Sequence, residues 1–441
     1  MVVLLLRELG DAVHEADRLG EGRQLELALE GTVDLLPVVE NAHTVEYGGS
    51  LSMRRMQTTR YLIVGGGMTA GAACKGIREH DPDGTVTLVG SEPHSPYKRP
   101  PLTKGLWSGG DEAKIWLGTG ELGVDLRLGR RIVSLDLDAR RATDDEGDEY
   151  SYEKLLLATG GSPRELGSSD ADVVYFRTFD DYRKVRALAD EGASFVVVGG
   201  GFIGSELAAS LTSNGRKVTM VFPDPAVCAR LLPAGLARFV TDYYREKDVE
   251  VLTEETVTSV ESGRVVTGSG RALEADAIVA GLGIVPRTDL AEAAGLAVDN
   301  GVVVDEYGRA GGREDVFAAG DVASFPAAAL GRSLRVEHED HANTHGRVVG
   351  ANMAGAEQPY DHLPFFYSDL FDLGYEAVGE LDSRLATVER WQEPNRKGVV
   401  AYVDDERRPR GFLLWNTWDK VDAARELIRA ARPVDEESLA L

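Results

Sequence analysis

The feature that most constrains this chain is a strand–glycine–helix pattern that occurs twice. Residues 60–64 form a short apolar run that leads directly into GGGMTA (residues 65–70) and a small-residue helix. A second apolar run, residues 194–198, leads into GGGFIG (residues 199–204) and another predicted helix. A lone glycine fingerprint is a weak signal, but here each one stands between a strand and a helix with a further strand behind. Two complete units predict two dinucleotides bound by one polypeptide.

Each small residue of the first fingerprint has a physical task. Gly65 permits the tight turn, Gly67 lets the backbone approach a pyrophosphate, and Ala70 allows the helix to pack on the strand. The free N–H groups at the start of the helix then face the phosphates. Glu92 follows the next strand, residues 85–89, and is expected to accept hydrogen bonds from the hydroxyls of an adenosine ribose.

The corresponding strand of the second unit bears on which coenzyme binds there. It covers residues 217–222 and is followed by Pro223 and Asp224, with no pair of arginines directly after it. A carboxylate at this position accepts a hydrogen bond from a ribose 2′-hydroxyl and repels a 2′-phosphate. The sequence therefore predicts that NADH is preferred over NADPH.

Three later apolar segments favour a flavin in the first unit and a nicotinamide in the second, the usual order in enzymes with two such units. Residues 155–161 and 281–286 are strand ends suited to closing the first and the second unit. A third strand, residues 316–322, ends in Asp321, where we expect a helix to begin. Asp321 is then placed to accept from a ribityl hydroxyl, and the simpler alternative is that it only caps the helix.

Charge and cysteine content exclude several classes of protein. The 441 residues include 73 acidic and 48 basic side chains and carry a net charge of −25, which disfavours binding to nucleic acid. No run of about 18 uncharged apolar residues exists, so no membrane-spanning helix is expected. The two cysteines, Cys74 and Cys228, are too few for a disulfide scaffold and indicate a reducing, cytoplasmic location.

Residues 1–56 differ from the rest and are expected to form a weakly ordered or helical extension. The apolar run 2–6 is stopped by Arg7 and has no basic segment before it, so it does not fit a secretory signal. The stretch that follows is too acidic for a mitochondrial transit peptide. We interpret the segment as a loosely attached extension or a start-site artefact, and the alternative is a small regulatory appendage.

Longer stretches of the chain resemble a known family. They are PYKRPPLTKGLW (96–107), YEKLLLATGGSPR (152–164), GGGFIGSELA (199–208), VFAAGDVASF (316–325), RVEHEDHANTHG (335–346), FFYSDLFDLGYEAVG (365–379) and GFLLWN (411–416). On these stretches, residues 60–432 resemble the FAD-dependent pyridine nucleotide-disulfide oxidoreductases. Within that family the resemblance is to the branch of apoptosis-inducing factor and the ferredoxin and rubredoxin reductases.

The resemblance implies an α/β fold. It comprises two Rossmann-like dinucleotide-binding domains, one for FAD and one for NAD(P)H, and a C-terminal α/β interface domain. The expected boundaries are 1–56 for the extension, 57–180 and 300–358 for the split FAD-binding domain, 181–299 for the NAD(P)H-binding domain and 359–441 for the C-terminal domain.

The resemblance also implies the route of the electrons. Disulfide reductases of the wider family carry a C-x-x-x-x-C pair beside the flavin, where this chain has RPPLTK (residues 99–104). Cys74 belongs to the first dinucleotide helix and Cys228 to the second unit, so we interpret both as structural. The flavin is therefore expected to pass electrons directly to an external acceptor.

Four residues are the expected catalytic group. By resemblance, Lys104 reaches across to Glu206 near flavin N5, and the two charges need each other because an isolated buried charge is costly. Glu337 and His338 precede a small-residue helix, residues 348–353, whose start is expected to face the pyrimidine edge of the flavin. Tyr367 stands where the family often has a tryptophan, which leaves the stacking contact on the flavin open.

The full set of expected cofactor contacts combines the fingerprints with the resemblance. For FAD they are Gly65, Gly67, Ala70, Glu92, Arg99, Lys104, Thr159, Gly160, Arg164, Gly320, Asp321, Glu337, His338 and Tyr367. For NADH they are Gly199, Gly201, Ile203, Gly204, Glu206, Asp224 and Gly283. No metal site is expected, because no cysteines or second histidine group join the helical trio His338, His341 and His345.

The predicted function is FAD-dependent NAD(P)H oxidoreduction, with a hydride passing from NADH to FAD N5 and electrons then passing to an external acceptor. Expected acceptors are a small ferredoxin- or rubredoxin-type protein, a quinone or dioxygen, and the expected state is a monomer or homodimer. The alternative is an NADH-responsive flavoprotein sensor of the apoptosis-inducing-factor type. Intact glycines, Asp321 and Lys104 disfavour a purely structural role.

Overall fold

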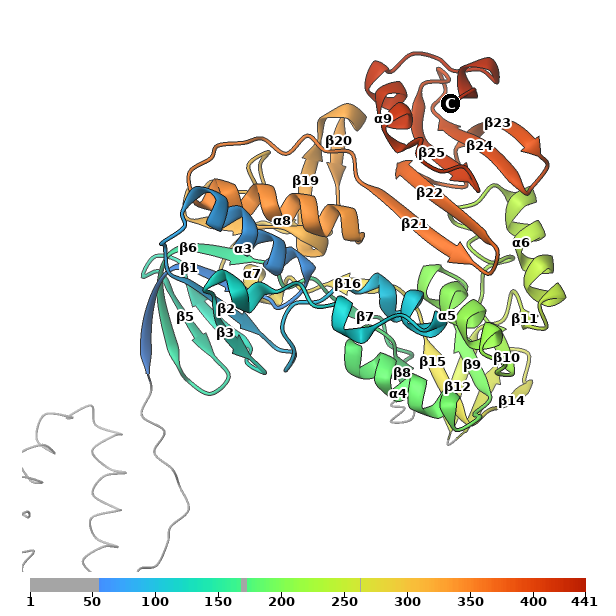
Figure 1. Cartoon of the computed structure of the whole chain (residues 1–441), viewed down its shortest axis with the longest axis horizontal. Helices are drawn as coiled ribbons and strands as arrows, with labels where there is room; N and C mark the ends of the chain where they lie inside the picture. Colours follow the sequence, from blue (N-terminus) through green and yellow to red (C-terminus); the bar gives the residue numbers. More distant parts are fainter. Residues whose placement is uncertain (1–54, 168–172, 262) are drawn as a thin grey trace, which may run out of the picture. The chain divides into compact units, whose positions relative to one another are not determined.

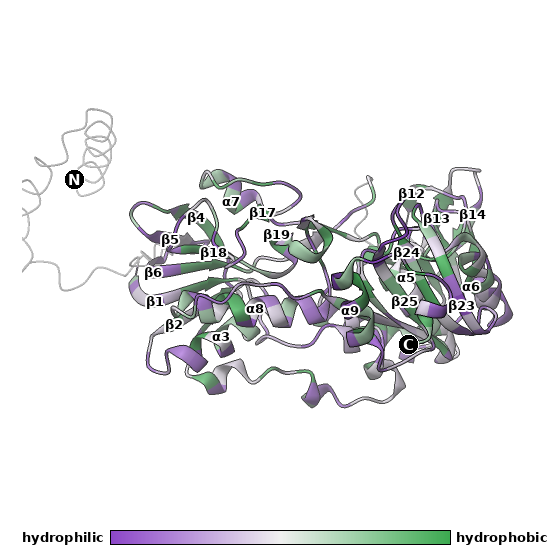
Figure 2. Cartoon of the chain, turned by 90° about the horizontal axis from the view of Figure 1, so that it is seen from above, coloured by the Kyte–Doolittle hydropathy of each residue, from purple (hydrophilic) through white to green (hydrophobic). Residues whose placement is uncertain are grey.

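The structure is a computed structural model that describes residues 55–167, 173–261 and 263–441. The prediction for residues 1–56 therefore lies outside the described residues, apart from Arg55 and Met56. The described chain is built around three larger sheets, each with its own helices (Figure 1). Figure 2 shows hydrophobic residues concentrated in the strands of these sheets and hydrophilic residues on the loops and outer helix faces.

The first sheet contains the first glycine fingerprint and is mostly parallel. Its order is β3-β2-β1-β6-β5-β4, with β18 beside β6. The strands are β1 (Met56–Val64), β2 (Val86–Gly90), β3 (Asp125–Leu128), β4 (Ile132–Asp136), β5 (Arg141–Asp144), β6 (Glu149–Leu157) and β18 (Val316–Ala318). β1 lies between two parallel neighbours, and its second half, residues 61–64, is apolar, with Leu62 and Ile63 fully buried. β18 comes from much later in the chain, so two separate segments build this unit.

Two helices from the same two segments pack against each other beside the first sheet (Figure 1). They are α3 (Met68–His80) and α8 (Glu339–Met353). Glycines make the contact close: a Cβ added to Gly76 would lie 2.0 Å from the carbonyl oxygen of Arg347, and one added to Gly350 would lie 2.2 Å from that of Ala73. This packing fixes α8 against the first dinucleotide unit.

The second sheet contains the second fingerprint and is entirely parallel, in the order β11-β10-β9-β15-β8. Its strands are β8 (Val173–Tyr175), β9 (Phe195–Val198), β10 (Val218–Val221), β11 (Glu250–Leu252) and β15 (Ala277–Ala280). Its helices are α4 (Phe179–Asp190), α5 (Phe202–Ser213) and α6 (Ala234–Glu246), and β12 (Val257–Glu261), β13 (Arg264–Thr267) and β14 (Ala272–Glu274) form a small added sheet. β8 pairs with β15 and so belongs to this sheet, although it precedes residue 181.

A short antiparallel pair joins the two dinucleotide units. β7 (Gly161–Pro163) follows the end of β6, and β16 (Ile284–Pro286) follows the end of β15. A Cβ on Gly161 would lie 2.5 Å from Cδ1 of Ile284, so this crossing depends on glycine. Smaller elements complete the first unit: α7 (Asp289–Ala293), β17 (Val302–Val303), β19 (Ala323–Ala327) and β20 (Arg332–Leu334).

The third sheet is antiparallel, in the order β21-β22-β25-β24-β23. Its elements are β21 (Phe365–Leu370), β22 (Leu373–Gly379), β23 (Ala386–Glu393), β24 (Lys397–Val403), β25 (Pro409–Trp415) and the helix α9 (Val421–Ala430). Its first strand reaches the second fingerprint, because the ring centroid of Phe366 lies 5.2 Å from that of Phe202 at the start of α5.

Two local expectations from the sequence are wrong. The chain after Asp321 does not form the expected helix: a single 3-10 turn, Gly320–Val322, leads straight into β19, whose Pro326 lacks the N–H that a helix needs. Asp321 is therefore not a helix N-cap. The helix expected over residues 348–353 begins much earlier, at Glu339, and its first turns carry mostly polar residues.

Candidate functional site

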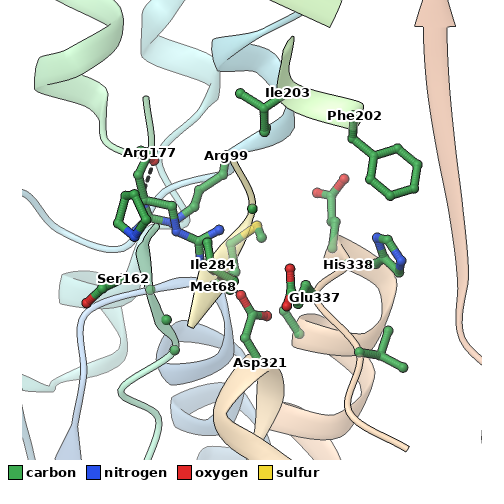
Figure 3. A pocket seen from close by; sticks show the side chains of 18 of the residues that line it. Met68, Arg99, Ser162, Arg177, Phe202, Ile203, Ile284, Asp321, Glu337 and His338 are labelled. Carbon is green, nitrogen blue, oxygen red and sulfur yellow. Dashed lines mark hydrogen bonds and ion pairs between the residues drawn. The ribbon is translucent and has the colours of Figure 1, made fainter. Parts of the chain in front are cut away.

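One large cavity, about 1660 Å³ in volume, is lined by the carboxyl ends of strands from both parallel sheets and by β21 (Figure 3). The lining includes the ends of β1, β2 and β6 from the first sheet and of β9, β10 and β15 from the second. Ligands of open parallel sheets bind in this position, since the connections diverge there and leave room. The cavity therefore lies where the two fingerprints predict their dinucleotides.

The first glycine fingerprint forms a cradle that fits a pyrophosphate. Gly65 has a φ of +130°, and a Cβ there would lie 2.1 Å from the carbonyl oxygen of Ala158. A Cβ on Gly67 would meet nothing within 4 Å, so this residue faces open space. Gly67 is also the N-cap of α3, and no side chain caps that helix. The uncapped N–H groups are donors for a bound anion.

The second fingerprint repeats this geometry. Gly199 has a φ of +120°, and a Cβ there would lie 2.4 Å from the carbonyl oxygen of Gly281. Gly201 is the N-cap of α5, again without a side-chain cap, and a Cβ on it would meet nothing within 4 Å. Two uncapped helix starts that open into one cavity fit two dinucleotides.

At one end of the cavity, arginines gather around two carboxylates. Arg99 Nη2 lies 2.5 Å from Oε1 of Glu92, and Arg177 Nη2 lies 2.8 Å from Oδ2 of Asp321. Arg131 and Arg287 also line this region, and Arg287 Nε donates to the Ser162 hydroxyl at 2.6 Å. Burial and the neighbouring guanidinium groups of Arg177, Arg131 and Arg99 lower the pKa of Arg287. This excess of cations suits the negative charge of a dinucleotide.

Lys104 and Glu206 meet as predicted from the sequence. Lys104 Nζ lies 2.6 Å from Oε1 of Glu206, whose side chain is only 5% exposed. The Glu206 carboxylate also accepts hydrogen bonds from the hydroxyls of Thr103 and Ser368, each at 2.6 Å. Lys104 Nζ lies 5.3 Å from the ring centroid of Tyr367. Three donors thus hold a buried carboxylate between the first unit, the second unit and β21, as such a charge requires.

His338 is the N-cap of α8 and lines the same cavity (Figure 3). Its ring stacks on that of Phe366 with a centroid distance of 4.0 Å, and it meets Phe202 edge to face. Burial lowers the pKa of His338 to about 4, so the imidazole is neutral near pH 7. Glu337 beside it pairs with Arg335 at 2.6 Å.

Asp224 lies where the sequence predicts the coenzyme ribose. It follows β10, lines the cavity and pairs with Arg230, whose Nε lies 3.1 Å from Asp224 Oδ1. The Arg230 side chain is 80% exposed and also lines the cavity. Arg230 was not predicted from the sequence, because it lies six positions after Asp224 and not directly beside it.

Most of the predicted contacts line the cavity, and four do not. Gly204 and Gly320 pack tightly instead: a Cβ on Gly204 would lie 2.0 Å from the Gly199 carbonyl oxygen, and one on Gly320 would lie 2.1 Å from Thr69 Oγ1. Ala70 is fully buried, and the backbone N–H of Arg164 donates to the Gly283 carbonyl. Lining or supporting residues that the sequence did not single out are Thr103, Arg131, Arg177, Arg230, Arg287, Glu339 and Ser368.

Both cysteines and the histidines His341 and His345 are buried in the structure. Cys74 is fully buried in α3, while Cys228 lines the cavity and its pKa is raised to about 12 by burial. His341 and His345 lie inside the fold, and His341 Nδ1 is 2.9 Å from the Tyr360 hydroxyl. Within the described ranges, no group of three or more His, Cys, Asp or Glu side chains is placed to hold a metal ion. No helix of the described part of the chain is long and apolar enough to cross a membrane.

Comparison with known proteins agrees with this geometry. Residues 59–346 match the pyridine nucleotide-disulphide oxidoreductases, and residues 349–396 match the C-terminal region of mitochondrion-associated apoptosis-inducing factor. The chain is 33% identical to apoptosis-inducing factor 1 of Dictyostelium discoideum, over 86% of this chain and 79% of that protein. It is 34% identical to the ferredoxin–NAD(+) reductase component of the anthranilate 1,2-dioxygenase system of Burkholderia cepacia, over 87% of this chain and 98% of that protein.

Among solved structures, the putidaredoxin reductase–putidaredoxin complex superposes with a TM-score of 0.81 at 28% identity, over 87% of this chain and 96% of the matched chain. The chain belongs to the pyridine nucleotide-disulphide oxidoreductase family. It is an FAD-dependent NAD(P)H oxidoreductase that passes electrons to an external acceptor, and the α/β fold and the family predicted from the sequence are confirmed.

Proposed function

We propose that this protein uses NADH to reduce a ferredoxin-type iron–sulfur protein, with the Lys104–Glu206 pair ordering the reaction centre. The observation that carries the proposal is the buried ion pair at 2.6 Å in a cavity that only one cysteine, Cys228, lines. A redox disulfide needs two neighbouring cysteines, and the sequence has only one other, Cys74, which is buried in α3. Electrons must therefore leave without a protein disulfide.

FAD, when bound, supplies a ring that accepts a hydride and can return its electrons one at a time. The chain's own residues bind and orient the two dinucleotides. The uncapped starts of α3 and α5 hold the phosphates, and Lys104, fixed by Glu206, places a positive charge in the buried part of the cavity. The neutral ring of His338 and the aromatic rings beside it help to exclude water.

Asp224 supports NADH as the physiological coenzyme. Its carboxylate lies at the end of β10 and would repel a 2′-phosphate. Steady-state kinetics with the two coenzymes test this assignment, and a kcat/KM that is higher with NADPH would overturn it.

The ferredoxin-type partner is supported by the relatives. The matched reductase component of Burkholderia cepacia carries ferredoxin in its name, and the matched putidaredoxin reductase was captured together with putidaredoxin. Both similarities extend over nearly the whole length of the relative. A partner of this class therefore fits the present chain.

Anaerobic stopped-flow measurements on the purified flavoprotein test the proposal. NADH should bleach the flavin absorbance within a turnover, and addition of a [2Fe–2S] ferredoxin should restore it while the ferredoxin spectrum bleaches. A persistent long-wavelength band that no acceptor discharges would contradict a reductase and favour an NADH-responsive sensor. Protein that cannot take up FAD at all would overturn both.

A further inference from the structure

The carboxylates that line the cavity differ in whether a cation neutralises them. Most have a basic partner within ion-pair distance: Glu92 with Arg99, Glu206 with Lys104, Asp224 with Arg230, Asp321 with Arg177, Glu337 with Arg335, Asp340 with His362 and Arg425, and Glu380 with Arg332 and Arg410. Within the described ranges two lining carboxylates have none, Glu339 and Asp289. Asp289 is exposed at the start of α7, whereas Glu339 is half-buried.

Glu339 is the first residue of α8, and its one side-chain partner is a phenol. The Tyr367 hydroxyl donates to Oε2 of Glu339 over a long 3.4 Å, which leaves Oε1 available to carry a proton. A position on the first turn of a helix favours the charged form of a carboxyl group. Burial opposes this and prevails, so that the pKa of Glu339 is raised above its usual value.

The other ionisable groups that face Glu339 and Tyr367 are few. Lys98 and Lys104 favour the Glu339 carboxylate, and the neighbouring Asp340 disfavours it. Tyr367 also faces Asp369 and Glu206, and burial raises its own pKa well above that of a free tyrosine. The phenol therefore stays protonated and acts as a hydrogen-bond donor, which leaves Glu339 as the group of this pair that titrates.

Glu206 provides the contrast within the same cavity. It accepts from Lys104, Thr103 and Ser368, three donors that stabilise a negative charge. Glu339 has one weak donor and a buried environment. With a single long hydrogen bond and a raised pKa, Glu339 is the one of these two carboxyl groups whose surroundings suit an acid.

We propose that Glu339, held by Tyr367, is the general acid that protonates a small quinone-type acceptor, one of the classes of acceptor expected from the sequence. The proposal rests on the proposed function, since the electrons come from NADH through the same site. An iron–sulfur protein takes up an electron alone, so a reductase restricted to such partners has no need of a buried acid.

The chemistry balances with a single proton from the protein. A quinone gains the two electrons and the one proton that make up the hydride given up by NADH, which yields the hydroquinone anion. The O–H bond of Glu339 then breaks as the second hydroquinone O–H bond forms, and the Glu339 carboxylate recovers a proton from water. In sum, NADH, one proton and a quinone become NAD⁺ and a hydroquinone.

A single-turnover experiment separates the acid from general damage to the site. Enzyme reduced with NADH under anaerobic conditions is mixed either with 1,4-benzoquinone or with ferricyanide, a one-electron acceptor that takes no proton. Glu339→Gln should slow reoxidation by benzoquinone about 100-fold, the lower range for loss of a general acid, and leave reoxidation by ferricyanide unchanged. Tyr367→Phe should slow the quinone reaction less, because the acid remains.

The matched control is Asp369→Asn, which removes another carboxyl group that faces Lys104 and has a pKa raised by burial, but that does not line the cavity. It should leave both acceptors unaffected. With the unaltered protein, the quinone rate should fall as pH rises through the raised pKa of Glu339, because only the protonated acid is active, and the ferricyanide rate should not follow it. Equal slowing of both acceptors by Glu339→Gln, or no slowing of either, would overturn the proposal.

Infrared spectroscopy gives a readout other than activity. At a pH below the raised pKa of Glu339, the oxidised flavoprotein should show the C=O stretch of a protonated carboxylic acid that shifts in D₂O, and one component of this band should be lost in Glu339→Gln but kept in Asp369→Asn. A band that is unchanged in Glu339→Gln would overturn the assignment of the acid. Failure of NADH to bleach the flavin would instead overturn the proposed function, so the two failures are distinguishable.

Discussion

At the scale of single residues, Arg287 shows how a charge without a partner indicates a ligand. No carboxylate of the described residues lies within ion-pair distance of its guanidinium, and Arg177, Arg131 and Arg99 all repel it. A dinucleotide pyrophosphate would relieve this repulsion. Charge-assisted hydrogen bonds contribute about 1.5–3 kcal/mol, so Arg287→Gln should weaken FAD binding by about 10- to 100-fold.

Titration of the flavin-free protein with FAD, followed by flavin fluorescence, measures this effect. The control is Arg183→Gln, since Arg183 is 61% exposed and its nearest carboxylate, in Glu112, lies 3.8 Å away. An Arg287→Gln protein that binds FAD as tightly as the control would show that the pyrophosphate does not reach this arginine.

The second prediction at this scale concerns Asp224 and Arg230 and the preference for NADH over NADPH. Asp224 repels a 2′-phosphate and at the same time engages Arg230 at 3.1 Å. Asp224→Asn should therefore remove the repulsion and free the Arg230 guanidinium to bind the phosphate. We expect the ratio of kcat/KM for NADH over NADPH to fall by at least about tenfold.

The double variant Asp224→Asn, Arg230→Gln tests whether Arg230 is the cause. If it is, the gain with NADPH should largely disappear in the double variant, since the two changes share one interaction. An equal gain in the single and the double variant would mean that loss of the negative charge alone is sufficient.

Single residues also show what spacing along a sequence can reveal. The glycines and Asp224 belong to short motifs, so their place near the cavity follows from local geometry. The pairing of Lys104 with Glu206 came from the resemblance, and the structure confirms the contact. Ser368 and Glu339 could not be found in this way, because they reach the cavity only through the packing of β21 and α8, which are distant in sequence from both fingerprints.

At the scale of elements, the contact between α3 and α8 depends on glycines. A Cβ on Gly350 would lie 2.2 Å from the backbone oxygen of Ala73, and backbone atoms cannot move aside as a flexible side chain can. Gly350→Ala should therefore push the helices apart at a cost of about 1–3 kcal/mol in stability, and should lower the Tm. Because α8 carries His338 and Glu339, FAD should also bind more weakly.

Gly235→Ala is the matched control for this prediction. Gly235 lies in α6, and a Cβ there would meet nothing within 4 Å. This change should raise stability slightly, by about 0.5–1 kcal/mol, because alanine loses less backbone entropy than glycine in a helix. Differential scanning calorimetry should show a lower Tm for Gly350→Ala and a slightly higher Tm for Gly235→Ala. An unchanged Tm for Gly350→Ala would contradict the close packing.

The helices and strands also differ in how well they could be predicted from the sequence. The strands and helices of both fingerprints were predicted to within a few residues, because hydrophobic runs and glycines fix them locally. The helix expected after Asp321 was wrong, because the pattern of an acid after a strand also suits a 3-10 turn before another strand. The early start of α8 was missed, since its first turns are polar and carry no hydrophobic periodicity.

At the scale of the whole molecule, the net charge of −25 predicts how added salt changes the reaction with charged acceptors. Long-range attraction or repulsion between the protein and a charged acceptor changes the association rate and is screened by salt, with a Debye length of about 10 Å at 0.1 M. With anionic ferricyanide, kcat/KM should therefore rise as KCl is added. With cationic cytochrome c as acceptor, kcat/KM should fall over the same range.

The experiment compares the slopes of log kcat/KM against the square root of ionic strength for the two acceptors, at fixed pH and saturating NADH. Opposite signs indicate that the overall acidic field governs the approach of acceptors to the cavity. If ferricyanide instead slows with salt, the local arginines that line the cavity, Arg131 and Arg287 among them, dominate over the net charge. That outcome would favour an acidic docking partner, because such a partner would then be attracted to the mouth of the cavity despite the charge of the whole protein.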